Sequence, residues 1–183
     1  MKLKTFLIVE CLGGLFTLSS CTAPTNVKDY SAYVNPFIGT GGHGHTFPGA
    51  VVPHGMIQPS PDTRIDGWDA CSGYYYADST INGFSHTHVS GTGCCDYGDV
   101  LLMPTVGKQQ YRTTDPQSQR LAYASSFSHK NEIAEPGYYS VFLDTYQVKA
   151  EISSTKRGAI HRYTFPENAE SGFIIDLDYS LQR

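Results

Sequence analysis

Two His-x-His pairs stand in glycine-rich stretches of the chain, and imidazole is the side chain best suited to binding metals or moving protons near neutral pH. The pairs are His43 with His45 and His86 with His88. On a β-strand, residues i and i+2 share a face, so each pair would be able to hold one transition-metal ion. Neither pair continues into the His-x-His-x-Asp-His pattern of metallo-hydrolases. A zinc hydrolase is therefore the weaker interpretation, and hydrogen bonding to loop backbone or to ligand hydroxyl groups is the stronger one.

Trp68 is the only tryptophan of the chain, and it lies in the polar loop Ile-Asp-Gly-Trp-Asp at positions 65–69. Core packing is the default role for a lone tryptophan, yet this loop is not an apolar run. An indole ring also stacks on the C–H face of a sugar, because it combines a large apolar face with a polar N–H. Both roles are open at this point. The neighbouring Arg64 and Asp66 form either an ion pair that locks the loop or contacts to ligand hydroxyl groups.

Two further carboxylates, Asp176 and Asp178, fall on one face of a predicted strand. A glycosidase needs two carboxyl groups that face each other across a cleft. Two residues on the same face of one strand do not supply that arrangement. We therefore expect Asp176 and Asp178 to make edge or turn contacts rather than to form a catalytic pair.

The elements that must position these side chains read as β-strands. Apolar and polar residues alternate with a period of two over much of residues 100–180, and no strong amphipathic helix pattern is present. Turn residues separate the runs, so that successive strands form hairpins. Strands are expected at 101–103 (closed by Pro104), 138–143, 148–153, 160–165 and 173–177, with a turn at 144–145. The pattern predicts an all-β fold, an antiparallel β-sandwich, which we expect to be incomplete because its last strand leaves an open edge.

The composition excludes several classes of protein. The 183 residues include 13 Lys or Arg and 17 Asp or Glu, for a net charge of −4. This acidic balance does not fit a nucleic-acid partner, which normally requires a basic surface. The 40% of hydrophobic residues, with 13 Tyr and 9 Phe, argues against disorder. Only 16% of residues are charged, against roughly a quarter in an ordinary domain. Such a chain suits an uncharged, hydroxyl-rich ligand.

The N-terminus resembles the export signal of a bacterial lipoprotein. Lys2 and Lys4 precede a mostly apolar stretch at residues 6–18, which is shorter than the ~20 residues that span a bilayer. Leu-Ser-Ser-Cys at 18–21 has the form of a lipobox, so Cys21 is the expected site of lipidation and the membrane anchor. A plain secretory signal is the alternative. The chain thus divides into a signal peptide at 1–20, a tether at 21–30 and a domain at 31–183. We expect a protein anchored in the cell envelope, periplasmic or on the outer membrane.

Three cysteines remain in the predicted domain: Cys71, Cys94 and Cys95. Adjacent cysteines do not readily pair with each other, and the spacing is not that of a Cys-x-x-Cys zinc site. A bridge from Cys71 to Cys94 or to Cys95 is open. The sequence alone does not choose between them.

Three motifs closely resemble the N-terminal domain of glycoside hydrolase family 92, the bacterial exo-α-mannosidases. They are Asn-Pro-Phe-Ile-Gly-Thr-Gly at 35–41, Gly-Phe-Ser-His-Thr-His-Val-Ser-Gly-Thr-Gly at 83–93 and Pro-Gly-Tyr-Tyr-Ser-Val at 136–141. The similarity extends over residues 33–178, and the long histidine motif is specific. Cys94 and Cys95 occupy a variable position of that motif, so the resemblance implies no role for them.

The resemblance implies a calcium-dependent, inverting enzyme that removes terminal mannose, often from α-1,2 links in glycans such as N-glycans or mannans. It also implies an N-terminal β-sandwich followed by an (α/α)6 barrel, with the active site between them. The general acid, the general base and most calcium contacts are expected in the barrel, so no catalytic residue and no metal ligand is expected in residues 1–183. The residues expected at the mannose pocket are Trp68, Asp66, His86 and His88, with Gly39, Thr40 and Gly41 at its floor.

Two other functions fit part of the sequence. One is a carbohydrate-binding lipoprotein without hydrolytic activity, which would need a self-sufficient sandwich. The other is an inactive, truncated gene product. Both predict that the complete protein releases no mannose, whereas the main hypothesis predicts that it does. The 183-residue chain alone is expected to be inactive.

Overall fold

The computed structural model describes residues 28–91, 93–109, 111, 120–167 and 169–181. The predicted signal peptide, Cys21 and most of the predicted tether lie outside these residues. None of the described helical segments is long and apolar enough to cross a membrane. The described residues form antiparallel strands and three short 3-10 turns, η1 (Ser31–Tyr33), η2 (Trp68–Ala70) and η3 (His129–Asn131). The prediction of an all-β sandwich is confirmed.

Four consecutive strands form an antiparallel meander, here called sheet II: β6 (Glu132–Glu135), β7 (Tyr138–Leu143), β8 (Val148–Ser154) and β9 (Ala159–Thr164). Short turns join them. The observed bounds of β7, β8 and β9 agree with the predicted ones to within one residue, whereas β6 was not predicted. Burial alternates along β9, where His161 and Tyr163 are half-buried while Ile160 and Arg162 are exposed. This period of two places one face of the meander on the core.

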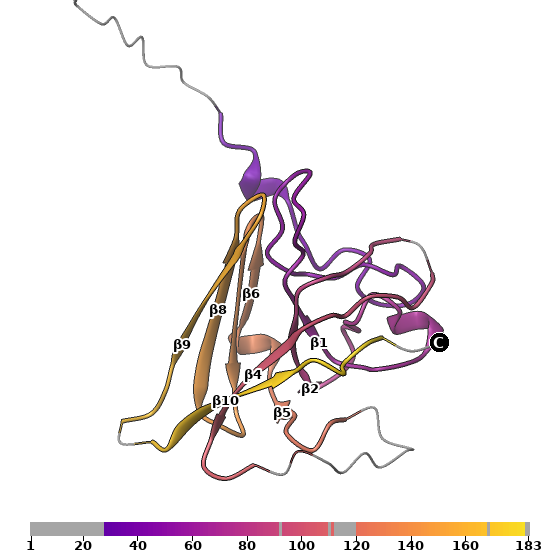
Figure 1. Cartoon of the computed structure of the whole chain (residues 1–183). Coiled ribbons are helices and arrows are strands. Elements are labelled where there is room, and N and C mark those ends of the chain that lie inside the picture. The colour runs from indigo at the N-terminus through magenta and orange to yellow at the C-terminus, as the bar shows by residue number, and fades with distance from the viewer. Residues whose placement is uncertain (1–27, 92, 110, 112–119, 168, 182–183) are drawn as a thin grey trace, which may run out of the picture.

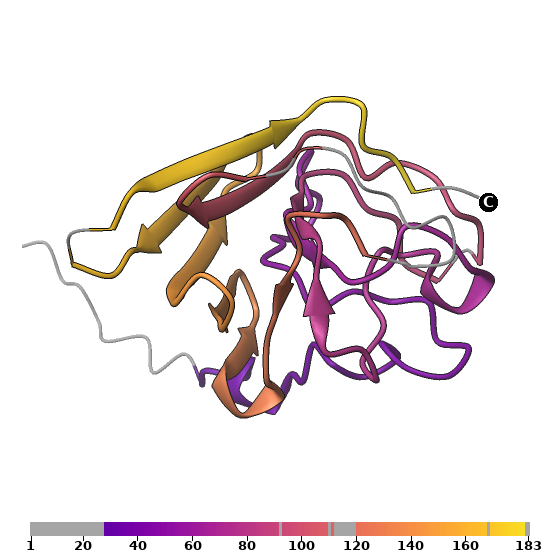
Figure 2. The same ribbon diagram turned by 90° about the horizontal axis from the view of Figure 1, so that it is seen from below.

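The second layer, here called sheet I, has the strand order β1-β3-β4-β10. Its strands are β1 (Ser60–Asp62), β3 (Gly83–Ser85), β4 (Leu101–Val106) and β10 (Ser171–Asp176). A two-stranded ladder, β2 (Thr80–Ile81) with β5 (Ser125–Ser126), completes the strands. Figure 2 shows the yellow β10 and the magenta β4 as a layer across the orange strands of sheet II.

The core lies between the two sheets. Phe84 of β3 is fully buried, and its ring centroid lies 6.4 Å from that of Tyr139 on β7 and 6.3 Å from that of Tyr163 on β9. Leu101 and Met103 of β4 are also fully buried. Aromatic pairs at these separations add packing energy to the burial of apolar area. Aromatic side chains, which are abundant in the sequence, thus pack between the two sheets and join them.

The predicted end of a strand at Pro104 is wrong, because β4 continues through Pro104 to Val106. Proline lacks the N–H that a central ladder needs, so it is tolerated where one side of a strand has no partner. The register between β3 and β4 is confined to Phe84 opposite Leu102, and only β10 pairs with β4 beyond that point. Pro104 therefore lies at an effective edge. The predicted strand at 173–177 is observed at Ser171–Asp176, as β10.

Residues 34–91 and 93–100 run mostly in loops, and part of them reaches sheet II, where the amide of Met56 donates to the carbonyl of Lys156 at 2.8 Å. Figure 1 shows most of these purple and magenta loops on the right, with η2 among them. The amide of Leu181 donates to the carbonyl of Tyr97 at 2.9 Å, which ties the segment after β10 to these loops. The sheets thus form a rigid base for a cluster of loops, an arrangement that often carries a functional site.

Candidate functional site

Trp68 opens η2 and remains largely exposed, with 57% of its surface accessible. Two histidine rings from the loop at residues 39–46 lie against it. The centroid of His45 is 4.2 Å from that of Trp68 in a T-shaped arrangement, and the centroid of His43 is 5.1 Å away. Asp69 pairs with His43, the distance from Oδ1 to Nδ1 being 2.5 Å. We call His43, His45, Trp68 and Asp69 the tryptophan cluster.

The two histidines of this cluster differ in their hydrogen-bonding capacity. An ionised carboxylate only accepts, so Nδ1 of His43 donates to Asp69, and Nε2 of the neutral ring is an acceptor on an exposed side chain. The His45 residue is only 7% exposed, and its buried Nε2 has no hydrogen-bond partner among the described residues. A buried polar atom without a partner is uncommon and marks a place where a ligand or water belongs. The cluster combines an apolar ring face with polar atoms suited to hydroxyl groups.

The loop at residues 39–46 holds these histidines in place. Gly39 has a φ of 84°, and its carbonyl accepts from the amide of Thr46 at 3.2 Å. A Cβ at this glycine would lie 2.9 Å from Oγ1 of Thr46, so only glycine fits the left-handed turn without strain. Thr40 is buried and its hydroxyl donates to the carbonyl of Phe37 at 2.8 Å, whereas Gly41 is exposed. These residues shape the loop from behind.

A cavity of about 280 Å³ adjoins the exposed tryptophan and is lined by Trp68, Gly93, Cys94 and Cys95. Gly93 has a φ of 63°, and a Cβ there would lie 2.9 Å from Nδ1 of His45 and 3.2 Å from Nε1 of Trp68. The backbone at Gly93 therefore approaches the two rings more closely than any residue with a side chain allows. The cavity gives the tryptophan cluster a concave flank.

His86 lies apart from the tryptophan cluster and joins the two sheets. Its Nδ1 is 2.6 Å from the carbonyl of Val100, and its Nε2 is 3.1 Å from Nε2 of His161 on β9. A carbonyl only accepts, so Nδ1 of His86 carries the proton and Nε2 accepts from His161. Nδ1 of His161 then accepts from the hydroxyl of Tyr163 at 2.8 Å. Burial, with a smaller contribution from His86, lowers the pKa of His161 to about 4.

The side chain of His88 is buried and does not form part of the molecular surface. Its Nδ1 donates to the carbonyl of Gln58 at 2.7 Å, and its Nε2 lies 2.8 Å from Oδ1 of Asp62 on β1 and 3.1 Å from the hydroxyl of Ser85. The side chains of His88 and Asp62 are both fully inaccessible. The structure thus gives His88 a role in joining β1 to the end of β3. The shared strand face that the metal interpretation required of His86 and His88 is not observed, because β3 ends at Ser85.

In the loop before η2, the ion pair between Arg64 and Asp66, one of the two interpretations of these residues, is not observed. Arg64 forms a bidentate pair with Asp78, with Nε and Nη2 each 2.8 Å from a carboxylate oxygen, and not with Asp66. The guanidinium also lies 4.3 Å from the ring centroid of Tyr75. Asp66 is exposed and precedes Trp68 by two residues. Among the predicted pocket residues, Asp66 therefore remains beside the cluster, while His86 and His88 are turned elsewhere.

Asp176 and Asp178 make the turn contacts that were expected. The hydroxyl of Tyr123 donates to Oδ2 of Asp176 at 2.6 Å, and the amide of Asp178 donates to Oδ1 of Asp176 at 3.0 Å. The structure thus offers no facing pair of carboxylates from these two residues. Within the described ranges, no three His, Cys, Asp or Glu side chains come together as a metal site, so the zinc interpretation gains no support.

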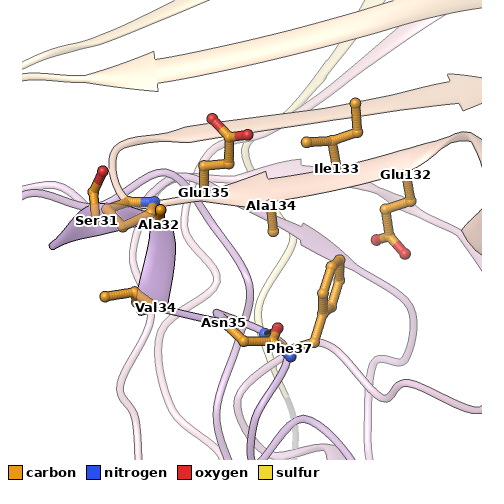
Figure 3. Close-up of a pocket in the computed structure, with 10 residues that line it drawn as sticks. Ser31, Ala32, Val34, Asn35, Phe37, Glu132, Ile133, Ala134 and Glu135 are labelled. Atoms are coloured by element: carbon orange, nitrogen blue, oxygen red, sulfur yellow. Dashed lines mark hydrogen bonds between the residues drawn. The ribbon is translucent and has the colours of Figure 1, made fainter. Parts of the chain in front are cut away.

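A larger concavity of about 620 Å³ lies between η1 and β6 (Figure 3). Glu132 points toward Phe37, whereas Glu135 lies on the other side of the strand (Figure 3). The carboxylate of Glu132 accepts from the hydroxyls of Tyr74 and Tyr139 and from Nδ1 of His129 at 2.6–3.1 Å. It is fully engaged in the core, so we do not place the functional site here.

His43, His45 and Asp69 belong to the tryptophan cluster but are not among the residues predicted for the mannose pocket. For the two histidines the sequence favours hydrogen bonds to loop backbone or to ligand hydroxyl groups over a metal, and it assigns no role to Asp69. The combination of a His-x-His loop with a tryptophan in a polar loop was the available signal. That sequence signal does not show that the two loops, which are more than 20 residues apart in the chain, meet in space.

Comparison with known proteins extends these observations. The sequence model of the glycosyl hydrolase family 92 N-terminal domain matches residues 33–183. An uncharacterised secreted glycosidase of Arthroderma benhamiae is 33% identical over 158 residues, which is 81% of this chain and 20% of that protein.

Two solved structures of Bacteroides thetaiotaomicron proteins also resemble the chain. One is a family GH92 α-mannosidase, solved also in complex with mannoimidazole, with 44% identity and a TM-score of 0.77 over 82% of this chain. The other is a family GH92 inverting mannosidase, with 32% identity and a TM-score of 0.67 over 81% of this chain. In each case the chain spans 20% of the matched protein's length.

Proposed function

Because this chain belongs to glycosyl hydrolase family 92 and carries the family's N-terminal domain, we propose that it is the front part of an inverting, calcium-dependent exo-α-mannosidase. The substrates would be mannose-containing glycans such as N-glycans or mannans. The 44% identity to a GH92 α-mannosidase that was solved with mannoimidazole supports this choice of sugar. The whole enzyme's activity is a proposal, since the chain spans only a fifth of the length of that relative.

The observation that carries the proposal is the exposed indole of Trp68 between two imidazoles and a cavity. The C–H face of a mannose ring would stack on the indole, because that contact removes apolar surface of both from water. Nε2 of His43 would accept from a sugar hydroxyl, and the unpartnered Nε2 of His45 would gain the hydrogen bond that it lacks. In this role the chain binds and orients the sugar.

The catalytic acid and base are proposed to come from another part of the protein. An inverting glycosidase holds its two carboxyl groups roughly 6.5–9.5 Å apart with a water molecule between them. Three carboxylates among the described residues already have partners: Asp69 with His43, Asp62 with His88 and Glu132 with two tyrosines. We therefore assign no residue of this chain as acid or base, and we expect the 183-residue chain alone not to hydrolyse mannosides.

Calcium is proposed to be held mainly outside this chain. Calcium takes 6–8 oxygen ligands, with carboxylates prominent among them. The described residues bring no three His, Cys, Asp or Glu side chains together for a metal, so they do not fit such a site by themselves. No step of the binding described above passes through the ion.

The protein is further proposed to be a lipoprotein of the cell envelope, anchored through Cys21. The sequence at residues 18–21 and the apolar stretch before it support this proposal. A multiply acylated cysteine would hold the enzyme at a membrane surface, where its glycan substrates arrive from outside. Radiolabelled palmitate incorporation that is lost in Cys21→Ser tests this part separately from catalysis.

The test of function is mannose release from α-linked mannobiose by the full-length protein, in calcium and in excess chelator, followed by proton NMR to identify the anomer. The proposal expects β-mannose as the first product in calcium and none with chelator. Activity of the 183-residue chain alone would contradict the placement of the acid and base. Glycan binding by the full-length protein without any hydrolysis would favour the carbohydrate-binding alternative.

A further inference from the structure

Two exposed tyrosines lie at the N-terminal end of the described chain, and the sugar-binding role uses neither. Tyr30 precedes η1 and is 65% exposed, and Tyr33 ends η1 and is 75% exposed. Their ring centroids are 6.4 Å apart, and Nζ of Lys28 lies 5.3 Å from the centroid of Tyr30 and 5.9 Å from that of Tyr33. The amide of Tyr33 donates to the carbonyl of Tyr30 at 3.1 Å, which holds the two residues in one turn. We call Lys28, Tyr30 and Tyr33 the tyrosine patch.

The tyrosine patch adjoins other exposed apolar side chains. Val34 directly follows η1, Ile133 lies on β6, and more than half of the surface of each is accessible. Both residues line the concavity between η1 and β6 that Figure 3 shows. Exposed apolar side chains are ordinary when they are scattered singly, but a group of them marks a surface that meets a partner or a membrane. The patch is therefore a candidate contact surface.

The proposed lipid anchor lies a short distance along the chain from the tyrosine patch, and the present inference rests on that proposed anchoring. Tyr30 is the ninth residue after Cys21. Because an extended residue spans at most about 3.3–3.6 Å, Tyr30 cannot lie more than roughly 30 Å from a lipidated Cys21. Figure 1 shows η1 as a short purple helix at the upper end of the domain, above β6 and β8. The anchor would thus keep this end of the domain close to the bilayer.

We propose that the tyrosine patch binds the lipid–water interface of the membrane in which Cys21 is anchored. Tyrosine suits this layer, because its ring enters the apolar region while its hydroxyl stays hydrated. The stem of Lys28 would lie along the rings, with its ammonium among the lipid phosphates.

The chemistry of the patch selects the kind of lipid surface and the consequence of the contact. Asp29 adjoins Lys28, and its carboxylate accepts from the amide of Ser31 at 2.9 Å. The two opposite charges cancel, so the contact depends on the rings and needs no anionic lipid. A lipid chain and the patch together give two points of attachment, which fix the orientation of the domain on the membrane. The patch contacts lipid and not the sugar, so turnover of a small soluble mannoside does not depend on it.

Hydroxyl-radical footprinting of the full-length protein tests the contact without relying on lipidation. Residues 1–21 are replaced by a hexahistidine tag, and the protein is held on phosphatidylcholine vesicles that contain a nickel-chelating lipid. Tryptic peptide 29–64 reports Tyr30 and Tyr33, and peptide 109–112 reports Tyr111, an exposed control tyrosine. On vesicles, oxidation of Tyr30 and Tyr33 is expected to fall at least about fivefold relative to the same protein in free solution, because lipid shields rings at the interface from the aqueous radical. Oxidation of Tyr111 is expected to stay unchanged.

Two footprints would overturn the proposal. Equal oxidation of Tyr30 and Tyr33 on and off the vesicles would show that a tether brings the patch near lipid without contact. Low oxidation of both tyrosines in free solution would show that another part of the full-length protein covers them. Palmitate incorporation at Cys21 is measured separately. Its absence would remove the proposed anchor, and the footprint would still decide the contact.

Release from the same vesicles by imidazole gives a second measurement. The double variant Tyr30→Ser/Tyr33→Ser has lost one of two attachments, so it is expected to leave at a lower imidazole concentration than wild type. Tyr111→Ser is the matched variant and is expected to leave with wild type. Release of all three proteins at the same concentration would contradict the contact. Both substitutions of the double variant are at exposed positions, so the variant is expected to fold.

Discussion

Replacing His88 by alanine is expected to destabilise the domain by about 3–5 kcal/mol, the usual cost of removing one partner of a buried ionisable pair. The side chains of His88 and Asp62 are both fully inaccessible, and Nε2 of His88 lies 2.8 Å from Oδ1 of Asp62. Without the imidazole, the carboxyl group of Asp62 and the carbonyl of Gln58 lose their partner in the core. Because domains are stable by only about 5–15 kcal/mol, the loss is a large share of the total.

Urea unfolding of the 183-residue chain, followed by far-UV circular dichroism, measures this loss. With a slope of about 2 kcal/mol per molar urea, the midpoint should fall by about 1.5–2.5 M. Asp62→Asn is a matched variant that keeps the volume and a hydrogen bond, and it should cost about 1 kcal/mol. His43→Ala is the control for a histidine whose side chain is 75% exposed, and it should change stability by less than about 0.5 kcal/mol.

The result that would refute the reasoning is a cost below about 1 kcal/mol for His88→Ala. That outcome would mean that the pair is not what joins β1 to the end of β3. A large cost with unchanged sugar affinity in the folded fraction would support the positioning role.

Three further predictions concern pH and backbone geometry. The pKa of His161 is lowered to about 4 by burial and by His86, so the folded state binds fewer protons than the unfolded one between pH 6.5 and 4; stability should fall as the pH falls through this window, and His161→Phe should flatten that slope. The pKa of Glu151 is lowered to about 2, first by Arg162 and then by Tyr138. Its contribution to the stability of the folded state should therefore be present above pH 4.5 and disappear toward pH 2. Acid titrations of Glu151→Gln should show a smaller loss of stability over that range. Gly93→Ala should cost about 1–2 kcal/mol and change the fluorescence of the sole tryptophan, because the new Cβ would meet the tryptophan cluster; an unchanged spectrum would contradict that geometry.

Three of the four strands of the meander, β7, β8 and β9, were predictable because their signals are local. Alternation and short turns alone gave β7 at Tyr138–Leu143 and β8 and β9 to within one residue. The end of β4 was not predictable in the same way. Whether Pro104 stops a strand depends on how far β3 runs alongside, which is a property of the partner strand. Strand bounds near a proline therefore need the sheet order, which the sequence does not state.

The candidate site was predictable in its residue types and less so in its grouping. The motif at 83–93 is one continuous unit of the sequence, yet its two histidines turn in different directions after β3 ends: His86 toward His161 and His88 toward Asp62. Trp68 meets His43 and His45 through loop closure over more than 20 residues. Such contacts depend on turn geometry at glycines with positive φ, which no periodicity reveals.

The measurement that tests the central claim most directly is kcat/KM of the full-length protein for an α-linked mannobioside, compared between wild type, Trp68→Ala and Tyr33→Ala. Tyr33 is an aromatic residue with 75% exposure in η1, outside the tryptophan cluster, and serves as the matched control. Loss of a stacking face worth about 1–3 kcal/mol should lower kcat/KM by roughly 5- to 150-fold in Trp68→Ala. Tyr33→Ala should leave it within about twofold of wild type. Equal activity of Trp68→Ala and wild type would contradict the claim that this chain forms part of the mannose pocket through Trp68.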